Sequence, residues 1–330
     1  MEALLLFVSF AIILAGALLF TNAIEWIGHR LGLGEGAVGS LLAAVGTALP
    51  ETLIAIVALV GATKSEDVAI GAIVGAPFLL ATLAMGLVGL TAYLYRGKRK
   101  QGIELNAHVP TLDRDLAFFM VFFGLALALG FGAPDGLRTV AGIVFFIAYV
   151  VYVAWTLRGG GEIQGHETLN DLIMERRPTH QENPSMGIAV VQVFVGLGAM
   201  VGGAHLFVEE LIHVAETIGV EAIVLSLILA PLATELPEKV NSFFWVREGK
   251  DSLALGNITG AMVFQSTIPI GIGLIFTEWE VSGNAAISMG LGLAGGLLAY
   301  WALRLRDRFE LGPVIIWLAL YASFIVIVAA

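Results

Sequence analysis

The most constraining feature of this sequence is a succession of ten apolar segments, each long enough to cross a lipid bilayer as a helix. The segments lie at 2–27, 34–61, 67–95, 115–132, 136–157, 187–214, 219–246, 251–276, 282–303 and 312–329. A spanning helix needs about 20 mostly apolar residues. Hydrophobic residues make up 58% of the 330 residues and charged residues only 13%, which excludes an ordinary soluble domain. We therefore expect an all-α membrane protein with ten transmembrane helices.

The distribution of lysine and arginine predicts the orientation of these helices. One set of alternate loops holds nearly all the basic residues, including the clusters at 96–100 and 304–308, whereas the opposite set holds only Lys64 and Arg138. Because basic loops stay in the cytoplasm, both termini are predicted to be extracellular, in a multi-pass protein of the cell membrane. The basic residues are confined to short loops, so we expect the partners to be lipid and small ions, with no nucleic acid.

The two halves of the sequence resemble each other. When Glu51 is placed on Glu238, Gly16-Ala17 falls on Gly203-Ala204 and Gly32 falls on Gly219. We predict a first five-helix repeat at 1–157, a cytoplasmic connector loop at 158–186 and a second repeat at 187–330. An odd number of spans inverts the second copy, and two inverted repeats around a midplane site are typical of secondary transporters.

The connector contains one stretch with the character of an interfacial helix. Residues from His166 to Arg177 could form a short helix on the inner membrane surface, with Leu169, Leu172 and Ile173 directed inward. We expect this segment to be a plain connector between the two halves rather than a regulatory element.

The strongest similarity between the halves is a short motif inside two apolar segments. Its copies are Gly46-Thr47-Ala48-Leu49-Pro50-Glu51 and Ala233-Thr234-Glu235-Leu236-Pro237-Glu238. A carboxylate at mid-membrane costs roughly 2.5–3.5 kcal/mol on insertion scales, so its repetition indicates a function. The spacing of four residues puts Thr47 with Glu51, and Thr234 with Glu238, on one helix face.

The prolines of the motif add neutral oxygens to the two carboxylates. Proline lacks an N–H, so the carbonyls of Gly46 and Ala233 lose their helical partners. Two such helices meeting at the repeat axis would offer a set of hard oxygen ligands, which suits calcium or sodium. Magnesium demands a tighter octahedral geometry and ranks lower. The chain has no cysteine, which excludes thiolate metal sites.

On these motifs, the chain resembles the cation/calcium antiporter superfamily, in particular the prokaryotic sodium/calcium exchangers. Those proteins carry Gly-Thr-Ser-x-Pro-Glu in the second and seventh spans and Gly-Asn-x-x-Gly-Ser at the start of the third and eighth. The counterparts of the second motif here are Gly71 to Ala76 and Gly256 to Ala261. The resemblance covers essentially the whole chain. It implies a secondary active antiporter that exchanges a divalent cation, most directly Ca²⁺, for Na⁺ by alternating access, with no cofactor.

The resemblance also implies site residues. Glu51 and Glu238 would be the main calcium ligands, Thr47 and Thr234 would add carbonyl or hydroxyl oxygens, and Asn257 matches the second motif as a peripheral site residue. Departures from the family pattern concern its sodium ligands. Neutral residues without a side-chain oxygen replace four family positions, at Ala48, Ala76, Leu80 and Ala261, and Gln265 replaces an acidic residue.

The coupling ion stays open at this level, because the second motif adds a third carboxylate at Glu235. Three carboxylates in a medium of low dielectric constant cannot all stay ionised without cations, which would suit H⁺-coupled exchange as the alternative. Lys239 follows Glu235 by four residues and could pair with it, extend toward the cytoplasm, or replace one transported cation as a fixed charge.

Two other classes of function are disfavoured. A cation channel would need a continuous polar path, whereas the polar residues here cluster at mid-membrane. An intramembrane enzyme is not expected, because the sequence has no His-Glu-x-x-His, no Gly-x-Ser-x-Gly and no nucleotide-binding loop.

Overall fold

The computed structural model of the chain describes residues 2–30, 43–105, 107, 109–158, 171–175, 185–281, 283–306, 308 and 310–329. Every extended regular element within these residues is helical, as predicted for an all-α protein. The elements are α1 (Glu2–Arg30), α3 (Ala43–Val60), α4 (Glu66–Leu79), the π-helical η2 (Leu80–Ala84), α5 (Met85–Leu94), α6 (Val109–Leu129), α7 (Asp135–Arg158), α8 (Met186–Ile218), α9 (Ala222–Arg247), α10 (Asp251–Gln265), α11 (Ile268–Phe276), α12 (Gly283–Arg306) and α13 (Leu311–Ala329).

Seven helical segments in the described chain are long and apolar enough to cross a membrane. They are Glu2–Arg30, Glu66–Leu94, Asp135–Thr156, Met186–Ile218, Asp251–Phe276, Gly283–Arg304 and Leu311–Val328. The other predicted segments coincide with α3, α6 and α9. Helix α6 begins at Val109 rather than at 115, so Asp115 lies inside the helix and not at its edge.

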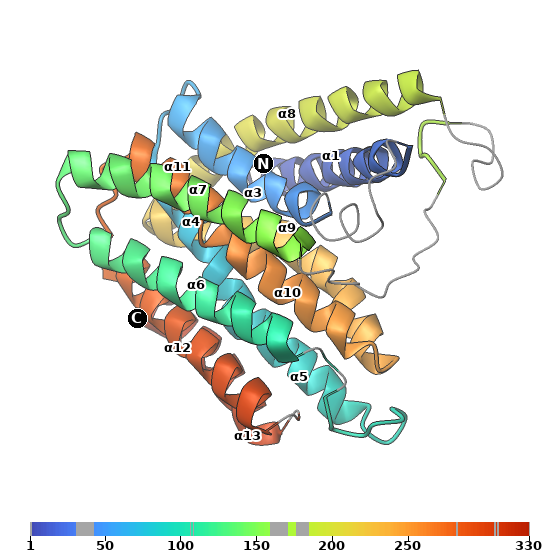
Figure 1. Cartoon of the computed structure of the whole chain (residues 1–330). Coiled ribbons are helices and arrows are strands. Elements are labelled where there is room, and N and C mark those ends of the chain that lie inside the picture. Colours follow the sequence, from blue (N-terminus) through green and yellow to red (C-terminus); the bar gives the residue numbers. More distant parts are fainter. Residues whose placement is uncertain are drawn as a thin grey trace.

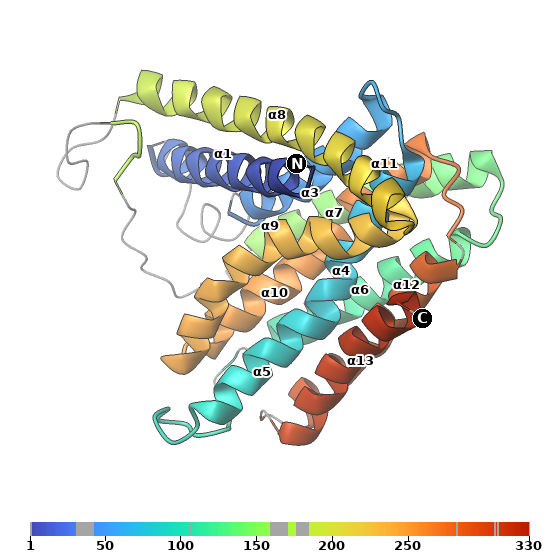
Figure 2. The ribbon, with the colours of Figure 1, turned by 180° about the vertical axis from the view of Figure 1, so that it is seen from behind.

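The molecule has a central and a peripheral set of helices. In the most apolar window of each segment, 94% of Glu66–Leu94 and 78% of Asp251–Phe276 is buried inside the protein, against 28% for both α1 and α8. Figures 1 and 2 show α1 and α8 side by side, set against one side of the remaining helices. The segments that follow the two Pro-Glu motifs therefore form the interior of the bundle.

Glycines bring α1 and α8 into close contact. A Cβ added at Gly16 would lie 2.7 Å from the carbonyl oxygen of Gly196, and one at Gly196 would lie 2.7 Å from that of Gly16. Small residues let transmembrane helices approach to backbone contact, which favours their association in lipid. Gly203 of α8 continues the same contact against Ile13 of α1. The two helices therefore form one closely packed pair.

The described part of the connector attaches to the end of this pair. Residues 171–175 form a turn and not the helix predicted between His166 and Arg177, the rest of which lies outside the described residues. Leu172 is buried against Trp26, as predicted, whereas Ile173 is 56% exposed. Asn22 Oδ1 accepts a hydrogen bond from the Ile173 N–H at 3.0 Å, and Gln192 Oε1 accepts one from the Met174 N–H at 2.8 Å. The turn thus contacts both α1 and α8.

Candidate cation-binding site

The two Pro-Glu helices meet through a direct contact between their side chains. Glu51 lies on α3, one residue after Pro50, and Thr234 lies on α9. The Thr234 hydroxyl donates a hydrogen bond to Glu51 Oε1 and lies 2.9 Å from the carbonyl oxygen of Ala230. Both residues are only 1% exposed. A buried carboxylate from the first half of the chain is therefore held against the matching motif of the second half.

Other predicted ligands are placed by their backbone alone. Gly46 and Thr47 belong to α3, and Glu238 belongs to α9, but the side chains of Thr47 and Glu238 lie outside the described part of the structure. The register of α9 puts Glu238 one helical turn beyond Thr234. Ala233 is partly buried on the same helix.

The remaining predicted site residues gather around Lys239, in a group that we call the lysine cluster. Its members are Glu235, Lys239 and Ser242 of α9 with Asn257 and Gln265 of α10. Lys239 is fully buried, with its Nζ 3.1 Å from Glu235 Oε2 and donating to Asn257 Oδ1 at 2.8 Å. Gln265 Nε2 donates to the other carboxylate oxygen of Glu235 at 3.2 Å. Ser242 Oγ lies 3.4 Å from Asn257 Oδ1.

The contacts of Lys239 favour its pairing with Glu235 over its extension toward the cytoplasm. The ammonium turns back onto Glu235, four residues earlier, and onto the neighbouring helix, so it does not extend toward the cytoplasm. Burying an ion pair is costly unless further hydrogen bonds satisfy both partners, and Asn257 and Gln265 provide them here. The third carboxylate of the predicted cluster therefore carries a fixed positive partner.

Both central segments are irregular beside the site. The third predicted span changes from α-helix to the π-helical turn η2 at Leu80, and the eighth is broken at Ser266–Thr267, directly after Gln265. In the sequence repeat, Leu80 and Gln265 are matching positions. Discontinuous helices are a common way to build ion sites at mid-membrane, because they release backbone groups from helical bonding.

Glycines hold one of these central segments close to α9. A Cβ at Gly71 would lie 2.5 Å from the carbonyl oxygen of Ile223, and one at Gly75 would overlap that of Leu227. These two glycines therefore let α4 approach α9 to backbone contact. Their counterparts Gly256 and Gly260 have no described atom within 4 Å of such a Cβ.

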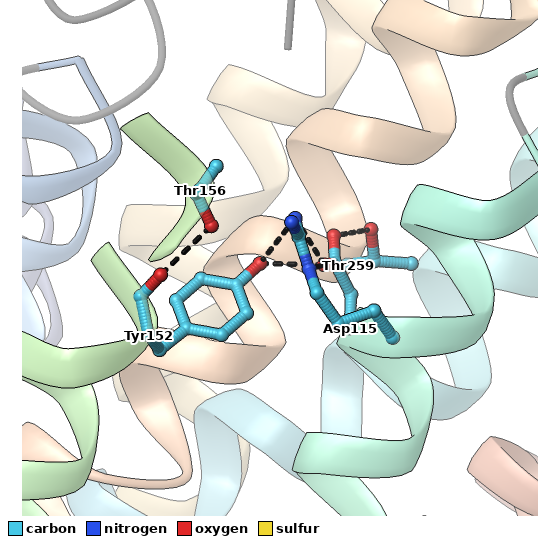
Figure 3. A network of polar contacts seen from close by, with 5 residues as sticks. Asp115, Tyr152, Thr156 and Thr259 are labelled. Carbon is cyan, nitrogen blue, oxygen red and sulfur yellow. Dashed lines mark hydrogen bonds and ion pairs between the residues drawn. The ribbon is translucent and has the colours of Figure 1, made fainter. Parts of the chain in front are cut away.

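A further buried carboxylate ties α10 to two other helices, as Figure 3 shows. Asp115 of α6 is 3% exposed and accepts hydrogen bonds from Thr259 Oγ1 of α10 at 2.9 Å and from the Tyr152 hydroxyl of α7. Arg114 Nη2 lies 3.0 Å from the same carboxylate. Thr259 follows Asn257 by two residues on α10, so this network positions the helix that contributes Asn257 and Gln265 to the lysine cluster.

Asp115 was not predicted as a network residue because of its position in the sequence. Asp113, Arg114 and Asp115 form a charged run at the edge of an apolar segment, and such a run ordinarily marks a helix boundary. The hydroxyls of Tyr152 and Thr259 are polar groups inside two other apolar segments. Three polar residues in separate spans are a signal for an interhelical network, although their spacing does not reveal which of them meet.

An all-helical protein with apolar spans, irregular central helices and a buried carboxylate of one half in contact with the other half is, by class, a membrane transport protein. Comparison with known families identifies it further. The chain belongs to the sodium/calcium exchanger family, whose model matches residues 1–158 and 188–330. The family consists of transporters and not of enzymes, and the resemblance stated from the motifs is thereby confirmed.

Individual proteins similar to the chain agree with this family. An uncharacterized membrane protein of Methanocaldococcus jannaschii, MJ0091, is 23% identical over 92% of this chain and 89% of its own length. The structure of the H⁺/Ca²⁺ exchanger CAX matches with a TM-score of 0.72 at 19% identity, covering 98% of this chain and 81% of that one. The sodium-calcium exchanger NCX_Mj matches with a TM-score of 0.59 at 20% identity, covering 98% of both chains. At these identities the two structures establish the fold.

Proposed function

We propose that this protein is a secondary active antiporter that exchanges Ca²⁺ for Na⁺ across the membrane by alternating access. The observation that carries the proposal is the hydrogen bond between Thr234 and Glu51. It joins the two copies of one motif at a buried point inside an apolar bundle, where placing a charge is costly. A transported cation bound there would neutralise that charge.

The proposed ligands of the cation are oxygens. They are the carboxylates of Glu51 and Glu238, the hydroxyls of Thr47 and Thr234, and the carbonyls of Gly46 and Ala233. Gln265 can add its amide oxygen, which has no hydrogen-bond partner among the described residues. Ca²⁺ takes six to eight oxygen ligands in flexible geometry, and a set of carboxylates, hydroxyls and carbonyls fits this requirement.

We further propose that ten helices cross the bilayer as two inverted repeats, at 1–157 and 187–330, joined by the cytoplasmic connector 158–186. The matched irregularities at Leu80 and Gln265 support this arrangement. Each half would contribute one Pro-Glu helix and one broken helix to the site. Both termini would then be extracellular.

Alternating access would use the α1–α8 pair as the moving part. The pair lies outside the buried central segments and packs against itself through Gly16 and Gly196. Sliding of this pair over the central helices would open the site to one side at a time. An empty site with bare carboxylates would resist the change, which enforces exchange over leak.

H⁺-coupled exchange of Ca²⁺ is the second candidate function. It is favoured by the absence of side-chain oxygens at Ala48 and Leu80, which are fully buried at positions where the family carries sodium ligands. Fewer oxygens would leave sodium poorly coordinated, and protons could then neutralise the carboxylates on the return step.

Purified protein in proteoliposomes separates these candidates. Uptake of ⁴⁵Ca²⁺ is measured under an imposed Na⁺ gradient, under an imposed H⁺ gradient and under neither, with the membrane potential clamped. The proposal predicts saturable uptake that requires the Na⁺ gradient. Uptake driven only by the H⁺ gradient would replace it with the second candidate, and uptake without either gradient would indicate a channel.

A further inference from the structure

Lys239 is the least expected residue of the site, because a fully buried ammonium is rare unless it is paired. Its contacts come from two helices: Glu235 Oε2 at 3.1 Å on α9 and Asn257 Oδ1 at 2.8 Å on α10. Ser242 Oγ lies against the same Asn257 oxygen. A cation is thus surrounded by oxygens, as an ion in a binding site would be, except that it is covalently attached to the chain.

The first half of the protein has no equivalent of this cation. In the sequence repeat, Glu235, Lys239 and Gln265 match Ala48, Thr52 and Leu80. Ala48 and Leu80 are fully buried, and the Thr52 hydroxyl donates to the carbonyl of Ala48 within α3. The second half therefore carries both the Glu235 carboxylate and the Lys239 ammonium, and the matching positions of the first half carry neither group.

The charge balance of the site follows from this asymmetry. Glu235 adds one negative charge and Lys239 adds one positive charge, so the lysine cluster adds no net charge to the carboxylates of Glu51 and Glu238. Without the lysine, a third buried carboxylate would need a mobile cation.

We propose that the Lys239 ammonium is a tethered cation that fills a monovalent-cation subsite formed by Glu235 and Asn257. The protein therefore carries one coupling cation fewer than the same site would with Glu235 unpaired. This inference rests on the proposed function. The geometry fits a tethered cation, because oxygens from two helices lie 2.8 Å and 3.1 Å from the ammonium nitrogen, in the place where a free cation would need them.

Thallous ion tests this assignment without reference to transport, because its anomalous scattering locates monovalent cations in crystals. Three proteins are soaked in Tl⁺: the wild type, Lys239→Gln, and the double variant Glu235→Gln/Lys239→Gln. The proposal predicts a thallium peak beside Glu235 and Asn257 in Lys239→Gln only. A peak at that position in the wild type, or none in a folded Lys239→Gln protein, would overturn it.

The ratio of coupling ions to Ca²⁺ separates the tethered cation from a purely structural ion pair. It is obtained in proteoliposomes from the potential at which net Ca²⁺ flux reverses. Lys239→Gln should carry one more monovalent cation per Ca²⁺ than the wild type, and the double variant should show the wild-type ratio. If Lys239→Gln has the same ratio of coupling ions to Ca²⁺ as the wild type, the Glu235–Lys239 ion pair has only a structural role.

The outcomes for the two proposals remain distinguishable. If the wild type transports no Ca²⁺ under any gradient, the proposed function fails, whereas the thallium peaks still report on Lys239. If Lys239→Gln does not fold, the soak of the wild-type protein can still overturn the proposal. A thallium peak beside Glu235 in the wild type would contradict the tethered cation.

Discussion

Thr234 and Glu51 are 183 residues apart in the chain, yet the threonine hydroxyl donates a hydrogen bond to the glutamate carboxylate inside the bundle. Each residue belongs to one copy of the same motif, and each is 1% exposed. The contact therefore places the first motif against the second at a buried point. In the proposed function, Glu51 binds the transported cation at this buried point.

Replacing the carboxylate should abolish tight binding of the transported cation. Glu51→Gln keeps the size and the hydrogen-bonding capacity of the side chain but removes its charge. Charged interactions of this kind contribute about 1.5–3 kcal/mol, so we expect the apparent Ca²⁺ affinity to fall roughly 10- to 100-fold. ⁴⁵Ca²⁺ uptake as a function of Ca²⁺ concentration measures this change.

The matched control for this variant is Thr52→Val. Thr52 follows Glu51 directly and is also buried, but its hydroxyl donates to Ala48 within the same helix at 2.9 Å. Uptake by Thr52→Val should stay close to that of the wild type. Equal losses in the two variants would show that α3 tolerates no change and would remove the evidence for Glu51 as a ligand.

The donor to Glu51 should matter through its hydroxyl alone. Thr234→Val keeps the shape of the side chain and leaves Glu51 without that hydrogen bond, whereas Thr234→Ser retains the hydroxyl. We expect a loss of about 1.5–3 kcal/mol in apparent Ca²⁺ binding for valine and a much smaller one for serine. If serine and valine behave alike in uptake assays, the hydroxyl has no role at the site.

The Asp115 network should stabilise the bundle rather than bind the cation. Tyr152→Phe removes one donor to a buried carboxylate, which costs about 1.5–3 kcal/mol, so the melting temperature in detergent should fall. Thr156→Val is the control, because its hydroxyl bonds only to the carbonyl of Tyr152 at 2.9 Å, and we expect about 0.5 kcal/mol or less. A Tyr152→Phe protein as stable as the control would contradict this assignment.

The close contact of α4 with α9 should fail when a methyl group is added. Gly75→Ala would place its Cβ against the carbonyl of Leu227, and such overpacking costs about 1–3 kcal/mol. Gly202→Ala is the opposite case, because Gly202 is exposed on α8 with no described atom near its Cβ, and alanine favours a helix over glycine by about 0.5–1 kcal/mol. Thermal unfolding of both variants should therefore shift in opposite directions; a shift in the same direction would refute the packing argument.

The sequence predicted the helices well because their signal is hydropathy, which depends on neighbouring residues alone. All ten predicted apolar segments coincide with helices of the described chain, although α6 starts at Val109, earlier than predicted. Three hydrogen-bond donors face the buried carboxylate of Asp115 inside this helix. The connector turn was not predicted, because Asn22 and Gln192, which bind it, lie in distant helices.

The site was predictable in its residue types but not in its pairings. The spacing of Glu235 and Lys239 made an ion pair possible, and three interpretations of the lysine remained. The contact of Lys239 with Asn257, on the next helix, and that of Gln265 with the other carboxylate oxygen of Glu235 exclude an extension of the lysine toward the cytoplasm. Its role as a fixed replacement for a transported cation stays a proposal. Such contacts depend on how α10 packs against α9, which one sequence does not specify.

The proposed cation site is tested most directly by a crystal structure of the protein soaked in Ca²⁺. We expect one Ca²⁺ ion bound by carboxylate oxygens of both Glu51 and Glu238 at about 2.3–2.6 Å, with Thr234 beside it. A structure in which Glu51 and Glu238 lie too far apart to share an ion, or in which Glu238 faces lipid, would contradict it.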